Sequence, residues 1–230
     1  MRGSLPAAQS LTAGYADTSG FLALKGLFTA HVTGNFVTLG SSLVLGTNGA
    51  LTKTLALPMF CLVVLLARLL AFRLKAAGWP MVRSLLQLQL LLLIVCAVLA
   101  AWLGPFENPD GWPALAVGMT LVAAMATQNA THRAYLAHTP PSTIMTGLST
   151  QIMLDLADLL HGLPSESVVA TRARLRRMTL SVAVFAAGCG LAALLYVRLD
   201  QWCFCALPLL GLAALIMGND IADADSRQGP

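Results

Sequence analysis

Charge is the property that this chain has least of. Of its 230 residues, 14 are lysine or arginine and 10 are aspartate or glutamate, so charged residues make up 10% of the total. A soluble domain carries about 25%. Hydrophobic residues make up 57%, and the mean hydropathy is +0.75. So little charge cannot cover a water-facing surface, which argues against a soluble enzyme, a disordered protein and a secreted disulfide scaffold. The composition indicates an integral membrane protein with one domain.

Motifs that mark metal, redox or catalytic chemistry are also missing. The five cysteines lie in apolar runs and form neither a CxxC motif nor a Cys/His pair at zinc-binding spacing. The sequence has no Walker, HExxH or GxSxG motif. We therefore expect no enzyme activity, no catalytic residues, no metal site and no cofactor. The net charge of +4 comes from basic residues at the ends of apolar runs, which favours membrane topology over nucleic-acid binding as its explanation.

Eight apolar stretches form two sets of four, and helical spacing fits all of them. We predict helices at about 7–24, 28–46, 53–74 and 84–104, and then at about 113–137, 142–161, 177–197 and 202–218. The last two stretches of each set are plain spanning segments, whereas the first two of each set carry nearly all the internal polar residues. This shared order predicts a diverged internal repeat, with repeat one at about 7–104 and repeat two at about 113–218 of a single transmembrane domain, 1–230.

A short motif supports the repeat. Thr33–Gly34 in the second stretch recurs as Thr146–Gly147 in the sixth stretch. Upstream of these pairs, Asp17 falls opposite Asn129 when one residue is gapped. Chance is the competing explanation for so short a match.

The distribution of lysine and arginine predicts the topology, because cytoplasmic loops collect these residues. The loops after the third and sixth stretches are basic, whereas the loop between the two sets carries Glu107 and Asp110 and no basic residue. If all eight stretches crossed the membrane, the two basic loops would lie on opposite faces. If the two polar stretches of each set make one net crossing together, both basic loops and both termini lie in the cytoplasm.

We therefore predict an all-α, polytopic helical membrane protein with about six net crossings, arranged as two inverted three-crossing repeats with broken or re-entrant helices. The sequence leaves open which member of each polar pair is re-entrant. Irregular backbone in a membrane occurs only where protein buries it or where it lines a wet cavity. Inverted repeats with interrupted helices are a recurring design of transporters.

The polar residues inside these stretches are the candidate site. Asp17 is the clearest of them, because a carboxylate in an apolar stretch costs about 2.5–3.5 kcal/mol on insertion scales and so requires a partner or a cavity. It is either an ion, proton or solute contact or a cap at a helix break. We expect a site near the bilayer midplane lined by substrate- or ion-binding residues of both repeats: Asp17, Thr33, Asn35, Gln128, Asn129 and Thr146. For the amides and hydroxyls the alternative is a hydrogen bond between helices.

Two acidic residues near the end of the sixth stretch present a similar choice. Asp155 and Asp158 share a helix face, and Gln151 lies on the same face as Asp155. If buried, two like carboxylates favour proton binding. If the end of this helix emerges into the cytosol, both are solvated.

Several of these residues belong to a recognisable pattern. The run Ala13–Gly14–Tyr15–Ala16–Asp17, the later run Phe28–Thr29–Ala30–His31–Val32–Thr33–Gly34–Asn35, and Gln128–Asn129–Ala130 with Thr146–Gly147 resemble the signature of the YoaK-like bacterial membrane proteins (DUF1275). The resemblance implies a multi-pass bacterial inner-membrane protein with no known substrate and no known catalytic residues. Leu148 stands where the first repeat has Asn35, which weakens any strict symmetry of site residues.

The leading hypothesis is a small-solute transporter or channel-like permease of the bacterial inner membrane. Its solute would be small and polar or cationic, and proton coupling would run through Asp17. The alternative is a non-transporting membrane scaffold or interaction protein, in which the polar residues only hold helices together. The expected partners are the lipid bilayer and the unidentified solute, not nucleic acid; a homo-oligomer is compatible with the sequence.

Overall fold

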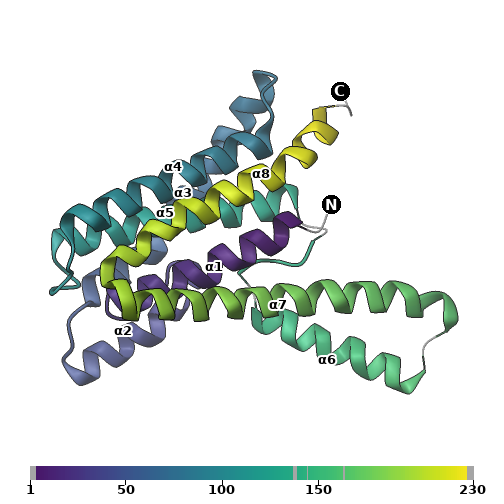
Figure 1. Ribbon diagram of the computed structural model, residues 1–230, viewed down its shortest axis with the longest axis horizontal. Coiled ribbons are helices and arrows are strands. Elements are labelled where there is room, and N and C mark those ends of the chain that lie inside the picture. The colour runs from purple at the N-terminus through teal and green to yellow at the C-terminus, as the bar shows by residue number, and fades with distance from the viewer. Residues whose placement is uncertain (1–3, 137–138, 144, 163, 227–230) are drawn as a thin grey trace.

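The structure is a computed structural model that describes residues 4–136, 139–143, 145–162 and 164–226, and all the regular secondary structure in that part is helical (Figure 1). Its elements are α1 Ser4–Ala23, α2 Gly34–Leu45, α3 Ala50–Ala76, α4 Met81–Leu103, α5 Trp112–Tyr135, α6 Met145–His161, α7 Ser165–Leu199, the 3-10 helix η1 Asp200–Ala206 and α8 Leu207–Ser226. The all-helical fold is therefore confirmed, with one α-helix for each apolar stretch.

Two helices begin far from their predicted starts. α2 begins at Gly34 rather than near 28, because residues 24–33 leave the helical path, with Lys25 at a φ of 51° and Gly26 at 95°. Glycine adopts this left-handed region without a steric penalty, so the turn is favourable at Gly26. α7 begins at Ser165 rather than near 177, because its arginine-rich segment continues the apolar helix. Hydropathy alone missed that extension.

The helices pack in pairs that have counterparts in the other half of the chain. α1 packs on α7 as α5 packs on α3, and α2 lies along α3 as α6 lies along α7. α4 packs on α5 as α8 packs on α1, while α4 and α8 contact each other. Exchanging the first four helices for the last four therefore converts each of these pairs into another of them or into itself; the weaker contact between α3 and α4 has no counterpart between α7 and α8.

One end of the bundle gathers the loops around Asp110, and we call it the Asp110 end. The Asp110 carboxylate accepts the backbone N–H groups of Gly49 at 2.8 Å and Thr52 at 3.0 Å, which fixes the start of α3. The Lys25 ammonium, just after α1, donates to the backbone carbonyl of Glu107. The end of α1, the α2–α3 connection and the α4–α5 loop therefore lie together.

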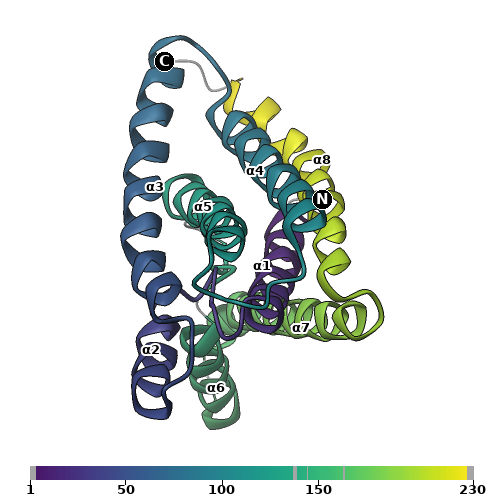
Figure 2. The ribbon, with the colours of Figure 1, turned by 90° about the vertical axis from the view of Figure 1, so that its left-hand side faces the viewer.

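The opposite end gathers the first turn of α1 with other helix ends, and we call it the Leu5 end. Leu5 packs in a buried cluster with Val82 near the start of α4, Leu136 after α5 and Ala214 of α8. In Figure 1 the start of α1 and the end of α8 lie toward this end. α2 lies toward the Asp110 end and α6 toward the Leu5 end, and Figure 2 shows both helices on the same side of the molecule.

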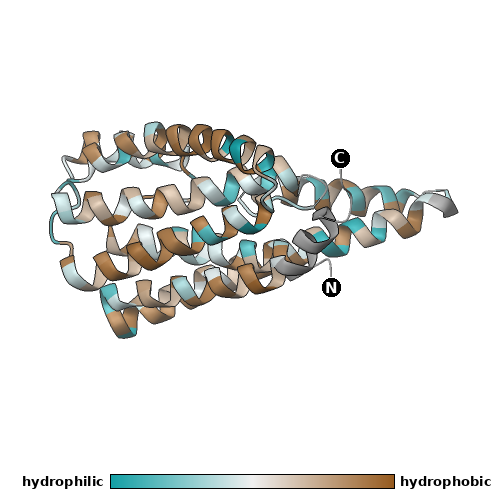
Figure 3. Cartoon of the chain, turned by 90° about the horizontal axis from the view of Figure 1, so that it is seen from above, coloured by the Kyte–Doolittle hydropathy of each residue, from teal (hydrophilic) through white to brown (hydrophobic). Residues whose placement is uncertain are grey.

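Three segments of the described chain are long and apolar enough to span a membrane: Ala50–Ala76, Met81–Leu103 and Ser167–Gly218. Large apolar side chains on these segments are exposed, including Leu66, Leu91, Trp102 and Ile216. Figure 3 shows that hydrophobic residues predominate along the helices of the bundle. An apolar exterior is unfavourable in water and favourable in lipid. Composition, length and exterior together identify a membrane protein.

Glycines allow a close contact between α1 and α7. A Cβ added at Gly14 would lie 2.2 Å from the backbone oxygen of Phe185, and one added at Gly188 would lie 2.4 Å from that of Leu11. Both distances are too short for any side chain, so each helix presents bare backbone to the other. Gly190, two residues further along α7, faces open space.

Candidate functional site

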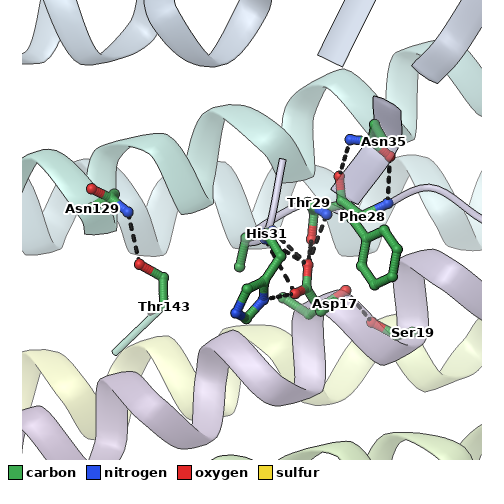
Figure 4. A network of polar contacts seen from close by, with 10 residues as sticks. Asp17, Ser19, Phe28, Thr29, His31, Asn35, Asn129 and Thr143 are labelled. Atoms are coloured by element: carbon green, nitrogen blue, oxygen red, sulfur yellow. Dashed lines mark hydrogen bonds and ion pairs between the residues drawn. The ribbon is translucent and has the colours of Figure 1, made fainter. Parts of the chain in front are cut away.

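Asp17 lies in the middle of α1 and holds the non-helical segment 24–33 against that helix (Figure 4). Its carboxylate accepts the backbone N–H of Thr29 at 2.8 Å, of Ala30 at 2.6 Å and of His31 at 3.2 Å. The Thr29 hydroxyl lies 3.4 Å away, and Nδ1 of His31 contacts the same carboxylate. These N–H groups precede α2 and have no place in a helical ladder.

Asp17 is thus buried, and groups of the same chain supply the hydrogen-bond donors that its carboxylate requires. Its side chain is 6% exposed, whereas that of His31 is 32% exposed and rests edge-on against the Phe185 ring. Of the roles predicted for Asp17, the cap at a helix break matches this geometry, although Asp17 caps a neighbouring segment rather than the helix that carries it. The pairing with His31 was not predicted, since a single histidine beside a Thr-Gly motif has no distinctive spacing.

Asn35 closes the same segment from its other side. Its Oδ1 accepts the N–H of Phe28 at 2.9 Å, and its Nδ2 donates to the Phe28 carbonyl at 2.8 Å. This pair of bonds joins the first turn of α2 back to the loop. Asp17 and Asn35 therefore share one loop, whereas the Thr33 side chain is exposed and outside both contacts.

The second half has a reduced version of this arrangement. Asn129 of α5 donates from Nδ2 to the hydroxyl of Thr143 at 2.8 Å (Figure 4), in the segment that precedes α6. Asn129 thus contacts the segment before α6 as Asp17 contacts the segment before α2, the correspondence that the gapped alignment predicted. The second half has a neutral amide where the first has a carboxylate. The Thr146 side chain is exposed on α6.

Gln128 belongs to a separate buried cluster. Its Oε1 accepts from Nε2 of Gln89 on α4 at 2.8 Å, and its Nε2 donates to the Ser142 hydroxyl at 3.0 Å. Gln89 and Gln9 of α1 are joined by a bond of 3.0 Å. All four side chains belong to residues at most 2% exposed. Sequence reasoning missed Gln9 and Gln89; the available signal was an amide within or beside a leucine-rich run.

The predicted site residues therefore fall into groups. Asp17 and Asn35 hold the loop before α2, while Gln128 and Asn129 hold the segment before α6. Within the described residues no hydrogen bond joins the Asp17 group to Asn129 and Thr143. No cluster of histidine, cysteine or acidic side chains in that part of the chain could hold a metal ion.

The two acids of α6 have different surroundings. Asp155 is fully buried and bound by the guanidinium of Arg174 on α7, with its Nε and Nη2 at 2.8 and 2.7 Å, and by Gln151 at 2.7 Å. Asp158 is exposed. A two-bond arginine–carboxylate pair is among the strongest polar contacts in proteins, so this pair fastens α6 to α7.

This pair predicts a pH dependence. The hydrogen bonds of Arg174 hold the pKa of Asp155 below its ordinary value. A lowered carboxyl pKa in the folded state adds stability at pH values above the unfolded pKa of about 3.9. That stability is lost as the pH falls through the folded value. Backbone hydrogen exchange of α6 in detergent should therefore be slow at pH 6 and accelerate, relative to α4, only below about pH 4. Protection of α6 that is already lost at pH 6 would contradict the pair.

No curated protein and no solved structure matches the chain. The model of DUF1275, described as a protein of unknown function, matches residues 5–217. This range covers all the helices described above except the first residue of α1 and the end of α8. The chain therefore belongs to the DUF1275 family.

Proposed function

We propose that the protein is a small-solute permease of the bacterial inner membrane, built from two inverted halves with six membrane crossings. The crossings are α1, α3, α4, α5, α7 and α8. The main packing pairs are preserved when the halves are exchanged, which supports a repeat. The inversion is supported by α2 and α6, which lie toward opposite ends of the bundle. Parallel halves would place α2 and α6 at the same end.

The segment from 24 to 45 supports a re-entrant path. It leaves α1 at the Asp110 end, where Lys25 contacts Glu107, and reaches the middle of α1 at Asp17. α2 then returns to the Asp110 end, because Gly49 just beyond it binds Asp110. The segment therefore enters the membrane from the Asp110 end and leaves it at the same end. Under the proposal, the segment around α6 does the same from the Leu5 end.

The observation that carries the proposal is the buried carboxylate at this depth. Asp17 lies where a half-length helix begins, beside the partly exposed ring of His31. Transporters place solute and ion sites at such interrupted helices near the midplane. A carboxylate, an imidazole and nearby amides suit a small polar or cationic solute, and the Asp17–His31 pair is the place for proton coupling. The basic loops support a cytoplasmic location for the Leu5 end and for both termini.

A native thiol can report whether water reaches this site. Cys189 of α7 is partly exposed, and its thiol lies beside the hydroxyl of Thr18, the residue that follows Asp17 in α1. In a variant that keeps only Cys189, we expect a small charged thiol reagent to label the protein in membrane vesicles. In a variant that keeps only Cys96, which is fully buried, labelling should be at least tenfold slower because water does not reach that thiol.

The same assay identifies solutes. A compound that occupies the site should slow labelling of Cys189, so a panel of small amines, amides and polyols can be screened for protection and the hits tested for uptake into proteoliposomes. Equal labelling of Cys189 and Cys96 would remove the water-filled path on which the permease depends.

One observation favours the second candidate, a non-transporting membrane scaffold. Asn35, Gln128 and Asn129 are all satisfied by partners within the chain. Side chains that only hold helices together behave in this way. A scaffold predicts that no solute protects Cys189 and that proteoliposomes take up none of the panel.

A further inference from the structure

The part of α7 at the Leu5 end extends beyond the rest of the bundle. α7 has 35 residues, so it is about 52 Å long, whereas the hydrocarbon core of a bilayer is about 30 Å thick. With α6 it forms a two-helix projection (α6 and Ser165–Met178 of α7), visible at the right of Figures 1 and 3. The Asp155–Arg174 pair holds this projection together.

Under the membrane placement proposed above, the arginines of the projection lie between the edge of the hydrocarbon and the outer headgroups. α7 crosses the middle of α1 at Phe185 and Gly188, which lie against Gly14 and Leu11. Arg177 and Arg172 are therefore about 14 and 22 Å from that level along the helix. The hydrocarbon of one leaflet ends about 15 Å from the midplane, and the headgroups extend to about 20–22 Å.

Three of these arginines are available to a ligand. Arg172, Arg176 and Arg177 are exposed, and no carboxylate among the described side chains lies at ion-pair distance from them. Arg174 is already bound to Asp155, and Asp158 is the other acidic side chain described on the facing helix α6. Arg172 and Arg176 are four residues apart and share a helix face. A guanidinium matches a phosphate oxygen pair in geometry and charge.

We propose that Arg172, Arg176 and Arg177 bind the phosphate groups of anionic phospholipids, which hold the α6–α7 projection at the membrane surface. The ligand chemistry is a phosphate diester anion in a lipid headgroup. This assignment rests on the membrane placement given above, but not on solute transport. A protein that transports nothing would still bind lipid here.

The test uses the full-length protein in neutral detergent and counts bound phospholipid by native mass spectrometry. Phosphatidylglycerol is the anionic probe, and phosphatidylcholine is the zwitterionic control. We expect the variant R172Q/R176Q/R177Q to bind phosphatidylglycerol at least tenfold more weakly than the wild type, since each basic residue near an anionic surface contributes about 1 kcal/mol. Binding by the wild type should also weaken as salt is raised.

A matched variant removes the same charge from the other basic loop of the Leu5 end. R73Q/K75Q/R83Q changes three exposed cations at the α3–α4 connection and should retain the affinity of the wild type. Equal loss in both variants would overturn the assignment to α7, as would equal binding of phosphatidylcholine. Inorganic phosphate that competes at the concentration of the lipid would show a free-anion site and overturn the lipid assignment. A circular dichroism melt of each variant confirms that it is folded.

Discussion

Replacing Asp17 with asparagine should destabilise the protein by about 2–5 kcal/mol, because a buried acceptor of charge-assisted bonds is lost. Asparagine offers one acceptor oxygen where the carboxylate offers two, and its amide N–H₂ would face the donors of Thr29, Ala30 and His31. The segment 24–33 would then lose its attachment to α1. A melt in detergent should show a transition roughly 5–15 °C lower than that of the wild type.

The control is Asp158→Asn, which removes the same charge from an exposed position on α6 and should leave the transition within about 1–2 °C. An unchanged transition in the Asp17 variant would mean that the loop does not depend on the carboxylate.

This structural role changes how transport data on Asp17 should be interpreted. Loss of uptake in the asparagine variant would follow from a displaced loop as readily as from a lost proton site. His31→Gln is the better probe of coupling, because it removes the partner imidazole and leaves the backbone bonds to Asp17 in place.

Replacing Gly188 with alanine should be the most damaging single-methyl change in α7. The added Cβ would lie 2.4 Å from the Leu11 carbonyl oxygen and 3.1 Å from the Tyr15 nitrogen, both backbone atoms that cannot rotate away. α1 and α7 would have to separate, at a cost of about 1–3 kcal/mol or more for overpacking. Thermal melts of the purified variant should show the loss.

Gly190→Ala is the matched control, since it adds the same methyl to the same helix where nothing lies within 4 Å. Helix propensity favours alanine over glycine by about 1 kcal/mol, so this variant should melt at or slightly above the wild-type temperature. Equal melting temperatures for the two variants would contradict the close contact between α1 and α7.

How far the sequence predicted the structure depends on the kind of signal. Long apolar runs predicted the helices, because a helix that spans lipid requires a long run of apolar residues, which the sequence shows directly. The start of α2 was missed because Lys25 and Gly26 turn the chain through left-handed backbone, a local event without a hydropathy signal. The start of α7 was missed because arginines interrupt hydropathy but not helix formation.

The sequence identified several residues of the candidate site but not the groups to which they bind. Asp17 and Asn129 stood out because polar groups in apolar runs require an explanation, and their positions in the two halves do correspond. Their partners are backbone N–H groups and a threonine hydroxyl, which only folding brings within reach. Gln9 lies 80 positions before Gln89 and 119 before Gln128, and no local pattern links residues so far apart.

Because the first half has Asp17 where the second half has Asn129, the segments before α2 and α6 are attached to the bundle with different strengths. The segment before α2 is bound to α1 by a carboxylate that accepts several donors. Among the described residues, the segment before α6 is bound to α5 by three side-chain bonds, from Asn129, Gln128 and His132, and none of them involves a carboxylate. A neutral bond contributes about 1 kcal/mol, and one to a charged group about 1.5–3 kcal/mol. If the protein opens one side at a time, we expect the Leu5 side to release first and more often, so that its resting state is biased toward the compartment that this side faces.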